Sequence, residues 1–344
     1  NFTPFLCFKF IQIMLARSRG SEYTYSMPWK TVQSKKRKNK KTKLALTVLG
    51  LIVLLILFSQ ARSLTQTLFS PWKLSASSDR TYSWNGEFNI NLILKDKDIS
   101  FVSYNPKEQK IIIIKIPDET YLDVPRGFGK WQLRAVYDLG QSQLLKNTLA
   151  GFFGLPVDGF VETNQLEALL QKNPFSILSL LPSLKTDLTL WELLRFKMSL
   201  SKVRFDKISE RSLEKSGVLD RASLSDGSQV FIADFVKMDS ILSDLADPNL
   251  VSEQKSVAIF NGTDHPQLAQ KANRLISNLG GHVIIVSNSK IRLKTTVTYG
   301  EKSATLTRLQ QIFGADGKPE QLEDIESSRA QINLFLGEDY FNLR

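Results

Sequence analysis

Hydrophobic and polar positions divide this chain into one long uncharged run near its start and two later regions of mixed patterning. Residues 44–58 carry no charge, and only Thr47 and Gly50 interrupt their apolar character. After residue 84, short apolar runs of strand length alternate with segments whose apolar positions recur every three or four residues. The pattern predicts an α/β protein with a single N-terminal transmembrane helix.

The uncharged run is long enough to cross a bilayer. Leu44 to Ala61 lies near the lower end of the roughly 17 to 25 residues that a membrane helix needs. A dense run of Lys and Arg directly precedes it, and such residues stay on the cytoplasmic side, so we predict a cytoplasmic N-terminus and an extracytoplasmic remainder. Ser59 and Ala61 have the spacing of a signal-peptide cleavage site, but the length of the apolar run favours an uncleaved anchor.

The first folded region opens with strand signals. Phe88 to Leu94 and Ile99 to Tyr104 are followed by a turn at Pro106 and by Lys110 to Ile116, which is apolar on both faces and is predicted as a central strand of a covered sheet. Later elements are predicted from periodicity and from breakers: helices over 133–137, 144–153, 164–170 and 234–245, a helix starting near Asp187, and strands over 157–161 and 229–233.

A second folded region follows the polar stretch 247–255. Its strands are predicted over 257–260, 282–286, 295–299 and 332–336, with a helix over 303–313. Another helix is predicted after Asp264, which can cap it, with Pro266 near its first position. Alternating strands and helices of this kind predict a small α/β domain with its helices packed on one sheet.

Six parts are therefore predicted along the chain. They are a basic cytoplasmic tail (1–43), a transmembrane helix (44–61), a linker (62–84), an α/β domain (85–246), a second linker (247–255) and a C-terminal α/β domain of repeated strand, helix and strand (256–344). The Ser- and Thr-rich first linker suits a tether that lifts a folded domain off a bilayer.

Charge does not extend this picture towards nucleic acid. The chain has a formal net charge of +11, but residues 1–60 hold 11 Lys and Arg against one acid, Glu22, which leaves 34 basic and 33 acidic residues beyond them. A basic face that follows a phosphate backbone is not expected, and no nucleic-acid partner is predicted.

The cysteine and histidine content limits the chemistry. The single cysteine, Cys7, precedes the apolar run, so no disulfide can form in the exported part. His265 and His282 are the only histidines, which excludes a multi-histidine metal site.

Several motifs resemble the LytR-CpsA-Psr (LCP) family of bacterial envelope proteins. In the C-terminal region, SVAIFNGTDHPQLAQKANRLISNLGGHVIIVSN and the later Leu336-Gly337-Glu338-Asp339 are similar to the family's C-terminal domain across nearly all of 256–340. In the first region, the Asn105-Pro106-Lys107 turn and the stretch Ile116-Pro117-Asp118-Glu119-Thr120 resemble the family's NPK turn and S-I-P-R-D-T motif. The resemblance implies an LCP-like α/β domain with a central mixed sheet, followed by a LytR C-terminal-type domain.

The same resemblance implies a reaction that this sequence is poorly equipped to perform. Family members move a glycopolymer from a polyprenyl pyrophosphate carrier to the cell wall, with arginines on the pyrophosphate and carboxylates on Mg²⁺. Here Asp118 stands in place of the motif arginine and Glu119 in place of its Asp. The G-x-D loop after the first strand is absent, and so is the R-x-R and D-x-x-R array after residue 165, while Asp98 keeps one acidic position.

Few candidate site residues remain. Asp98 and Glu119 are the candidate catalytic carboxylates, and with Asp118 they could hold a divalent cation, although solvation at strand ends explains them as well. Arg126, Lys130 and Arg134 recur every four residues and are the candidate ligand-binding cations.

The alternative for these cations is a solvated loop plus one helix face, which the glycines at 127 and 129 favour. No metal site and no cofactor are predicted, except Mg²⁺ if the protein is catalytically active.

We therefore expect a membrane-anchored, extracytoplasmic cell-envelope protein that binds or scaffolds without catalysis. Its expected partners are membrane lipid through Leu44 to Ala61 and either cell-wall glycopolymer or other envelope proteins. The alternative is an active phosphotransferase that moves a glycopolymer from polyprenyl pyrophosphate to peptidoglycan, with a site rebuilt from Asp98, Glu119 and the Arg126–Arg134 cations.

Overall fold

The computed structural model describes residues 80, 82–164, 173, 176, 184–319 and 328–343. The chain divides into two compact units, Asn1–Phe58 and Ser59–Arg344, and every described residue lies in the second. The predicted cytoplasmic tail and transmembrane helix, and most of the first linker, lie outside the described residues, as does the helix predicted over 164–170 apart from its first residue. Within the described part of the chain, no helix is both long enough and apolar enough to span a membrane.

The first domain is built on a mixed six-stranded sheet, in agreement with the prediction. Its strands lie in the order β7-β6-β1-β2-β3-β8. The pairs β1–β2, β2–β3 and β6–β7 are antiparallel, whereas β1–β6 and β3–β8 are parallel. The strand bounds are β1 Ile90–Lys95, β2 Ile99–Asn105, β3 Lys110–Ile116, β6 Gly159–Glu162, β7 Lys185–Thr186 and β8 Ile208–Ser212.

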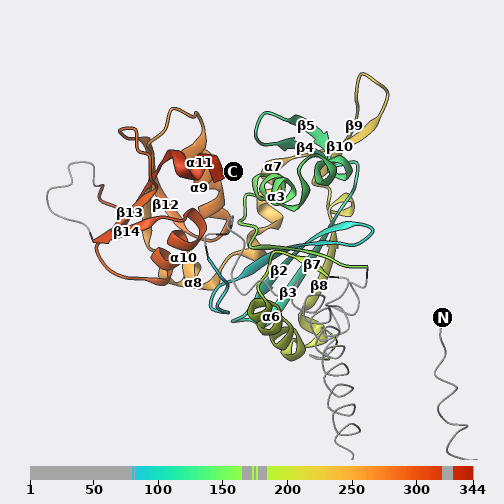
Figure 1. Cartoon of the computed structure of the whole chain (residues 1–344), viewed down its shortest axis with the longest axis horizontal. Helices are drawn as coiled ribbons and strands as arrows, with labels where there is room; N and C mark the ends of the chain where they lie inside the picture. The colour runs from blue at the N-terminus through green and yellow to red at the C-terminus, as the bar shows by residue number, and fades with distance from the viewer. Residues whose placement is uncertain are drawn as a thin grey trace, which may run out of the picture. The chain divides into compact units, whose positions relative to one another are not determined.

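Helices cover both faces of this sheet, which explains why β3 is apolar on both faces. Helix α3 (Leu133–Phe153) and helix α6 (Leu190–Lys202) lie on opposite sides of the β2–β3 layer (Figure 1). Ile112 and Ile114 of β3 pack in the core cluster that contains α3, while Ile111 and Ile113 pack in the one that contains α6. The prediction of a buried, covered strand is confirmed.

Helix α3 joins the two helices predicted over 133–137 and 144–153. The backbone leaves helical geometry at Gly140 and Gln141, which is where the sequence pattern breaks, and the helix resumes beyond this kink. It ends at Gly154, whose φ of 60° forms a left-handed C-cap, a backbone conformation that glycine adopts readily.

Smaller elements complete the first domain. A hairpin of β4 (Tyr121–Val124) and β5 (Gly129–Gln132) connects β3 to α3, and a second hairpin pairs β9 with β10. The remaining bounds are β9 Leu219–Ser223, β10 Gln229–Ala233, α7 Phe235–Ile241 and the 3-10 turns η2 Phe205–Lys207, η3 Glu214–Ser216 and η4 Ser243–Leu245.

The C-terminal domain is a five-stranded sheet in the order β12-β11-β15-β13-β14. The pair β13–β15 is antiparallel, and the other neighbouring pairs are parallel. The element bounds are β11 Ser256–Asn261, α9 Leu268–Asn278, β12 His282–Asn288, β13 Thr296–Tyr299, α10 Ala304–Phe313, β14 Asp316–Pro319, β15 Ile332–Leu336 and α11 Glu338–Leu343.

One helix start in this domain differs from its prediction. Helix α9 begins at Leu268, after an N-cap at Gln267 with a φ of 64°, and Asp264 does not cap it. Asn261 instead uses its side-chain amide to hold the carbonyl of His265, so residues 262–267 form a braced turn and not the first turn of a helix. Helix α10 agrees with the helix predicted over 303–313, and Ser303 caps it, because its side chain accepts from the amide of Leu306.

Residues 247–255, predicted as a linker, contain the short helix α8 (Pro248–Glu253). Asp247 caps this helix through the amide of Asn249 at 2.9 Å, and its second carboxylate oxygen accepts from the amide of Asn89 at 2.9 Å. Leu250 is buried in a core cluster that includes residues of α3 in the first domain and of α9 and α10 in the second. The segment therefore packs against both domains.

A buried polar contact also joins the two domains. Arg308 of α10 is fully buried, and its guanidinium donates to the carbonyl of Asn89 at 3.0 Å, to the Asp158 carboxylate at 3.4 Å and to the Tyr82 hydroxyl. The Tyr82 hydroxyl in turn donates to Asp158. A buried ion pair of this kind is costly to break, because each partner would be left charged away from water.

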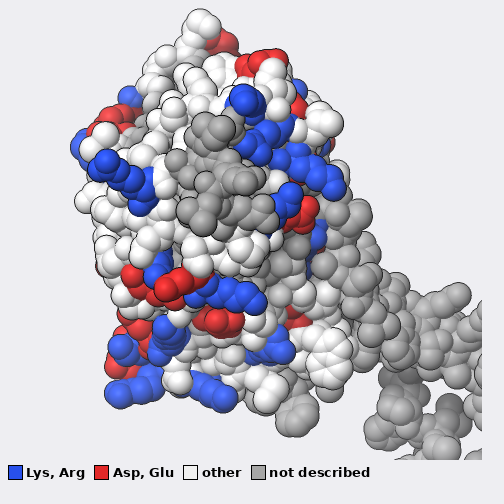
Figure 2. Space-filling view, turned by 90° about the vertical axis from the view of Figure 1, so that its left-hand side faces the viewer, with Lys and Arg blue, Asp and Glu red and all other residues white. Residues whose placement is uncertain are grey.

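Charges on the surface are mixed where the structure shows them. Figure 2 shows blue Lys and Arg side chains close to red Asp and Glu side chains along the lower part of one face. This agrees with the near balance of basic and acidic residues beyond residue 60.

Candidate functional site

The strand directions bring four strand ends together at one edge of the first sheet. Strand β6 runs parallel to β1, and β8 runs parallel to β3. Two antiparallel steps through β2 give β1 and β3 the same direction. The carboxyl ends of β1, β3, β6 and β8 therefore share one edge, which is the place where open α/β sheets bind ligands.

The turn after β3 lies at this edge and is fixed by its backbone. The amide and the hydroxyl of Thr120 both donate to the carbonyl of Pro117, at 3.0 and 2.7 Å. The amides of Leu133 and Arg134 donate to the carbonyls of Thr120 and Asp118, which attaches the turn to the start of α3. The position of this turn is thus set by main-chain bonds and by the Thr120 hydroxyl.

The acidic side chains predicted at this turn influence one another. Partial burial raises the pKa of Asp118, and the charges of Asp98 and Glu119 raise it further, while Arg134 opposes the shift. Asp98 and Glu119 are both exposed. Neighbouring negative charges disfavour the ionised form of the Asp118 carboxyl group, so this corner of the site is electronegative.

These carboxylates do not fit the Mg²⁺ that the family resemblance implies. Among the described residues, no group of three or more His, Cys, Asp or Glu side chains is placed to hold a metal ion.

The three candidate cations do not share a helix face. Arg126 lies in the hairpin turn with a φ of 65°, Lys130 lies in β5 opposite Asp123, and Arg134 lies in the first turn of α3. All three are exposed. No described residue forms a hydrogen bond or ion pair with the side chain of Arg126 or Lys130. Arg126 and Lys130 thus lie on an exposed hairpin and Arg134 on a helix, so the three cations do not form the single helix face that their spacing suggested.

A second charged cluster at the same edge was missed by the sequence reasoning. Glu162, the last residue of β6, binds Lys95 at 2.6 Å, Lys185 at 3.5 Å and the hydroxyl of Tyr137 at 2.8 Å. Burial acts to raise the pKa of Glu162, but the hydrogen bonds from Lys95 and Tyr137 and the charges of the lysines lower it overall. Burial and the bond to Glu162 raise the pKa of Tyr137 to about 12.

In this cluster, Lys95 and Lys185 are already paired with Glu162, so their charges are not available to an anionic ligand. Lys95 also lies 4.4 Å from the centre of the Tyr137 ring, so its ammonium is held by both a carboxylate and an aromatic face. Lys95 is the last residue of β1 and Glu162 the last residue of β6. A charged residue at the end of an apolar strand is the sequence signal that could have identified both.

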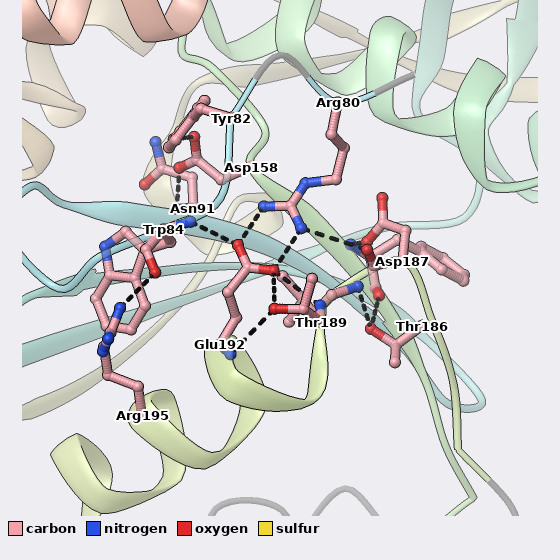
Figure 3. Close-up of polar contacts among 12 residues, drawn as sticks. Arg80, Tyr82, Trp84, Asn91, Asp158, Thr186, Asp187, Thr189, Glu192 and Arg195 are labelled. Atoms are coloured by element: carbon pink, nitrogen blue, oxygen red, sulfur yellow. Dashed lines mark hydrogen bonds and ion pairs between the residues drawn. The ribbon is translucent and has the colours of Figure 1, made fainter. Parts of the chain in front are cut away.

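A buried network holds the start of the described chain against α6 (Figure 3). Arg80 donates two hydrogen bonds to Glu192, at 2.7 and 2.8 Å. Glu192 also accepts from the amides of Trp84 and Thr189. Burial acts to raise the pKa of Glu192, but the bonds and charge of Arg80 and the two backbone amides lower it overall. The sequence signal for this network is the capping box Thr189-x-x-Glu192 at the start of α6.

The family-like motifs of the C-terminal domain converge on one another. The amide of Gly262 donates to the carbonyl of Leu336 at 2.9 Å. The amide of Gly337 donates to the hydroxyl of Thr295 at 3.0 Å, and the Asp339 carboxylate accepts from the amide of Thr295 at 2.9 Å. The Asn-Gly-Thr turn and the Leu-Gly-Glu-Asp segment are therefore adjoining parts of one braced structure.

Comparison with known proteins bears on both domains. Residues 254–340 match the family model described as LytR cell envelope-related transcriptional attenuator. These residues form a LytR C-terminal domain. The matched range agrees with the resemblance predicted over 256–340. Together with the relative described in the next paragraph, this match confirms the predicted resemblance to the LytR-CpsA-Psr family.

A curated relative extends the likeness beyond the LytR C-terminal domain. The chain is 26% identical over 155 residues to the polyisoprenyl-teichoic acid–peptidoglycan teichoic acid transferase TagU of Bacillus subtilis strain 168. The match covers 39% of this chain and spans half the length of TagU.

Solved structures that match part of this chain include TagT of Bacillus subtilis, at 15% identity and a TM-score of 0.38 over 49% of this chain and 95% of TagT. TagV of Bacillus subtilis has 12% identity and a TM-score of 0.39 over 47% of this chain and 97% of TagV.

Proposed function

We propose that this protein is held at the outer face of a bacterial membrane and binds a cell-wall glycopolymer without transferring it. The likeness to TagU, which is named as a teichoic acid transferase, supports a role with a wall glycopolymer. The membrane attachment rests on the apolar segment Leu44 to Ala61. The absence of transfer rests on the residues at the carboxyl edge of the first sheet.

The observation that carries the proposal is the state of Asp118. It occupies the position where the motif it resembles has an arginine, and its pKa is raised by burial and by Asp98 and Glu119. A pyrophosphate placed at this turn would meet carboxylates instead of the forked donors that bind phosphate well. Phosphoryl transfer depends on neutralising charge on the phosphate oxygens, and this corner adds negative charge.

The neighbouring lysines do not replace the missing arginine. Lys95 and Lys185 both contact Glu162, so an incoming anion would have to compete with that carboxylate. The positive charge of Arg134 acts to lower the pKa of Asp118, so part of that charge is already offset by a carboxylate.

The β4–β5 hairpin next to this edge offers a surface that suits a polymer of sugars and phosphates. Phe128 and Trp131 are 42% and 41% exposed, and the indole N–H of Trp131 donates to the carbonyl of Phe128 at 2.8 Å. Arg126 and Lys130 stand exposed on the same hairpin. Aromatic rings stack on sugar rings, and exposed cations attract phosphate, so we assign polymer binding to this hairpin.

The test separates binding from transfer. The full chain in detergent is incubated with a labelled polyprenyl-pyrophosphate-linked oligosaccharide, Mg²⁺ and isolated peptidoglycan, and the label in the peptidoglycan is measured. We expect none above background. Label transferred to peptidoglycan would establish the active phosphotransferase in place of this proposal.

Binding is measured by sedimenting the chain with isolated walls that carry glycopolymer, and with the same walls after the polymer is stripped. We expect sedimentation only with the intact walls, and a reduction of about tenfold in apparent affinity for the Trp131→Ala, Lys130→Ala double variant. Lys318→Ala, an exposed cation on β14, is the matched control and should bind as the unchanged chain does. Equal sedimentation with stripped walls would contradict the binding role.

A further inference from the structure

The outer face of helix α6 carries a stripe of exposed side chains that the carboxyl-edge site does not use. The exposed positions of the helix are Trp191, Arg195, Met198 and Lys202, which follow the i, i+4, i+7, i+11 spacing of one helix face. Trp191 is 65% exposed and Met198 57% exposed. The opposite face is buried against the sheet through Leu193, Phe196 and Leu200, so the exposed stripe is the outer surface of a firmly packed helix.

The stripe continues into the 3-10 turn after the helix. Phe205 is 84% exposed, which makes it the most exposed of the large hydrophobic side chains in the described part of the chain. Arg204 and Lys207 flank it and are exposed. The acid within this turn is Asp206, which pairs with Arg204 at 3.1 Å, while Glu210 beyond it pairs with Lys115. Lys202 and Lys207 are thus left as exposed cations beside exposed aromatic and thioether groups.

The length of the connecting chain sets an upper limit on the distance between this face and the predicted anchor. Arg80, the first described residue, is held on α6 by Glu192, and Trp84 is held by both Glu192 and Arg195 (Figure 3). The described part of the chain therefore begins beside α6. Residues 62–79 can span at most about 65 Å when fully extended, which limits how far this face can lie from the end of the apolar run.

We propose that the outer stripe of α6 and the Phe205 turn form a contact surface for an anionic lipid bilayer. Trp191, Met198 and Phe205 would enter the headgroup region, where aromatic and apolar side chains with cationic neighbours are favoured. Lys202 and Lys207 would lie against lipid phosphates. The proposal rests on the anchored location proposed above, and it adds an orientation in which α6 faces the membrane.

The experiment uses the full chain and one labelled position at a time. In a Cys7→Ser background, which removes the chain's single cysteine, Phe205→Cys carries an environment-sensitive fluorophore. The chain is reconstituted into vesicles of phosphatidylcholine with phosphatidylglycerol, or of phosphatidylcholine alone, each containing a headgroup-attached quencher lipid. The matched control is Val236→Cys on α7, a position that is 83% exposed.

We expect the Phe205 label to be quenched severalfold more than the Val236 label in the anionic vesicles, and less in neutral ones. Replacing Lys202 and Lys207 by Glu should lower the quenching of the Phe205 label to about that of the Val236 label, because the attraction to anionic lipid is lost. Equal quenching at both labelled positions would overturn the inference. A second outcome would also overturn the inference. If the Phe205 label in detergent becomes less exposed to water as the protein concentration rises, a second copy of the chain covers the stripe.

A second measurement distinguishes a failure of the proposed α6 surface from a failure of the predicted membrane anchor. Flotation of the chain with vesicles in high salt, which screens contacts between lysines and lipid phosphates, tests the anchor alone. A chain that floats while its Phe205 label stays unquenched would refute the α6 surface and leave the anchor intact. A chain that does not float in high salt, but whose Phe205 label is quenched when anionic vesicles are added in low salt, would support the surface without the anchor.

Discussion

The two family-like regions of this molecule use their motif residues in different ways. In the LytR C-terminal domain, the motif residue Gly262 donates to the carbonyl of Leu336, and the motif residues Gly337 and Asp339 both bind Thr295. These motif residues therefore build the fold. At the carboxyl edge of the first sheet, the turn is held by the backbone of Pro117, Asp118 and Thr120. No described residue forms a hydrogen bond with the side chain of Asp118. A motif that holds itself together resists substitution, whereas one that serves a ligand can lose its chemistry while its backbone stays in place.

The largest expected effect tests whether both regions belong to one cooperative unit. Replacing Arg308 by Ala leaves Asp158 buried without its guanidinium partner and should lower the free energy of unfolding by about 3 to 5 kcal/mol. Urea unfolding followed by tryptophan fluorescence and by circular dichroism measures it, with the exposed Arg329→Ala as control. A loss below about 1 kcal/mol would show that the pair does not hold the domains together.

The next effect tests whether the C-terminal motif is needed for the fold. A Cβ at Gly337 would lie 2.5 Å from the carbonyl carbon of Lys294, which is backbone and cannot move aside cheaply. Gly337→Ala should therefore destabilise the chain by about 1 to 3 kcal/mol. Gly300→Ala is the matched control, because nothing lies within 4 Å of the added Cβ. Similar midpoints for the two variants in urea would remove the structural reason for this glycine.

The same substitution made in each region sharpens the contrast. Asp339→Ala removes an acceptor from the amide and hydroxyl of Thr295, a residue that is 1% exposed, and should cost about 1 to 3 kcal/mol. Asp118→Ala should change the free energy of unfolding by less than about 0.5 kcal/mol. Thermal and urea unfolding of the two variants measure the difference, and a greater loss for Asp118→Ala would reverse the assignment.

The smallest effect is the pH dependence of Asp118. Because its pKa is raised in the folded protein, its favourable contribution is present below the unfolded pKa of about 3.9 and is lost as the pH rises through the folded value. Asp118→Asn should therefore raise the free energy of unfolding at pH 7, by less than about 0.5 kcal/mol since the group is partly solvated, with a smaller gain at pH 4. A decrease at pH 7 would mean that the carboxylate is stabilised there.

Much of the fold could be predicted because its signals are local. The apolar run of β3, the Ser303 cap of α10 and the glycine stop of α3 each follow from a few neighbouring residues. The β4–β5 hairpin was missed because its turn uses three residues with positive φ, Arg126, Gly127 and Gly129, which broke the expected pattern without showing what replaced it. Strand β14 was missed because all four of its residues are exposed.

The site was less predictable because its contacts are distant in sequence. The turn at Pro117–Thr120 was found through the family resemblance, whereas the Lys95–Glu162 pair depends on β6 lying beside β1, and strand order cannot be read from periodicity. Arg80 and Glu192 are 112 positions apart and meet only through the fold. Residues whose roles depend on tertiary neighbours therefore needed the structure.

The central claim is that the carboxyl edge disfavours a pyrophosphate because an acid stands where a cation would bind it. The direct test is calorimetric titration of polyprenyl pyrophosphate into the full chain and its Asp118→Arg variant, with Asp226→Arg in the exposed β9–β10 turn as a control of equal charge change. The account predicts at least about tenfold tighter binding for Asp118→Arg than for the unchanged chain or the control. Saturable binding by the unchanged chain that Asp118→Arg weakens would contradict it.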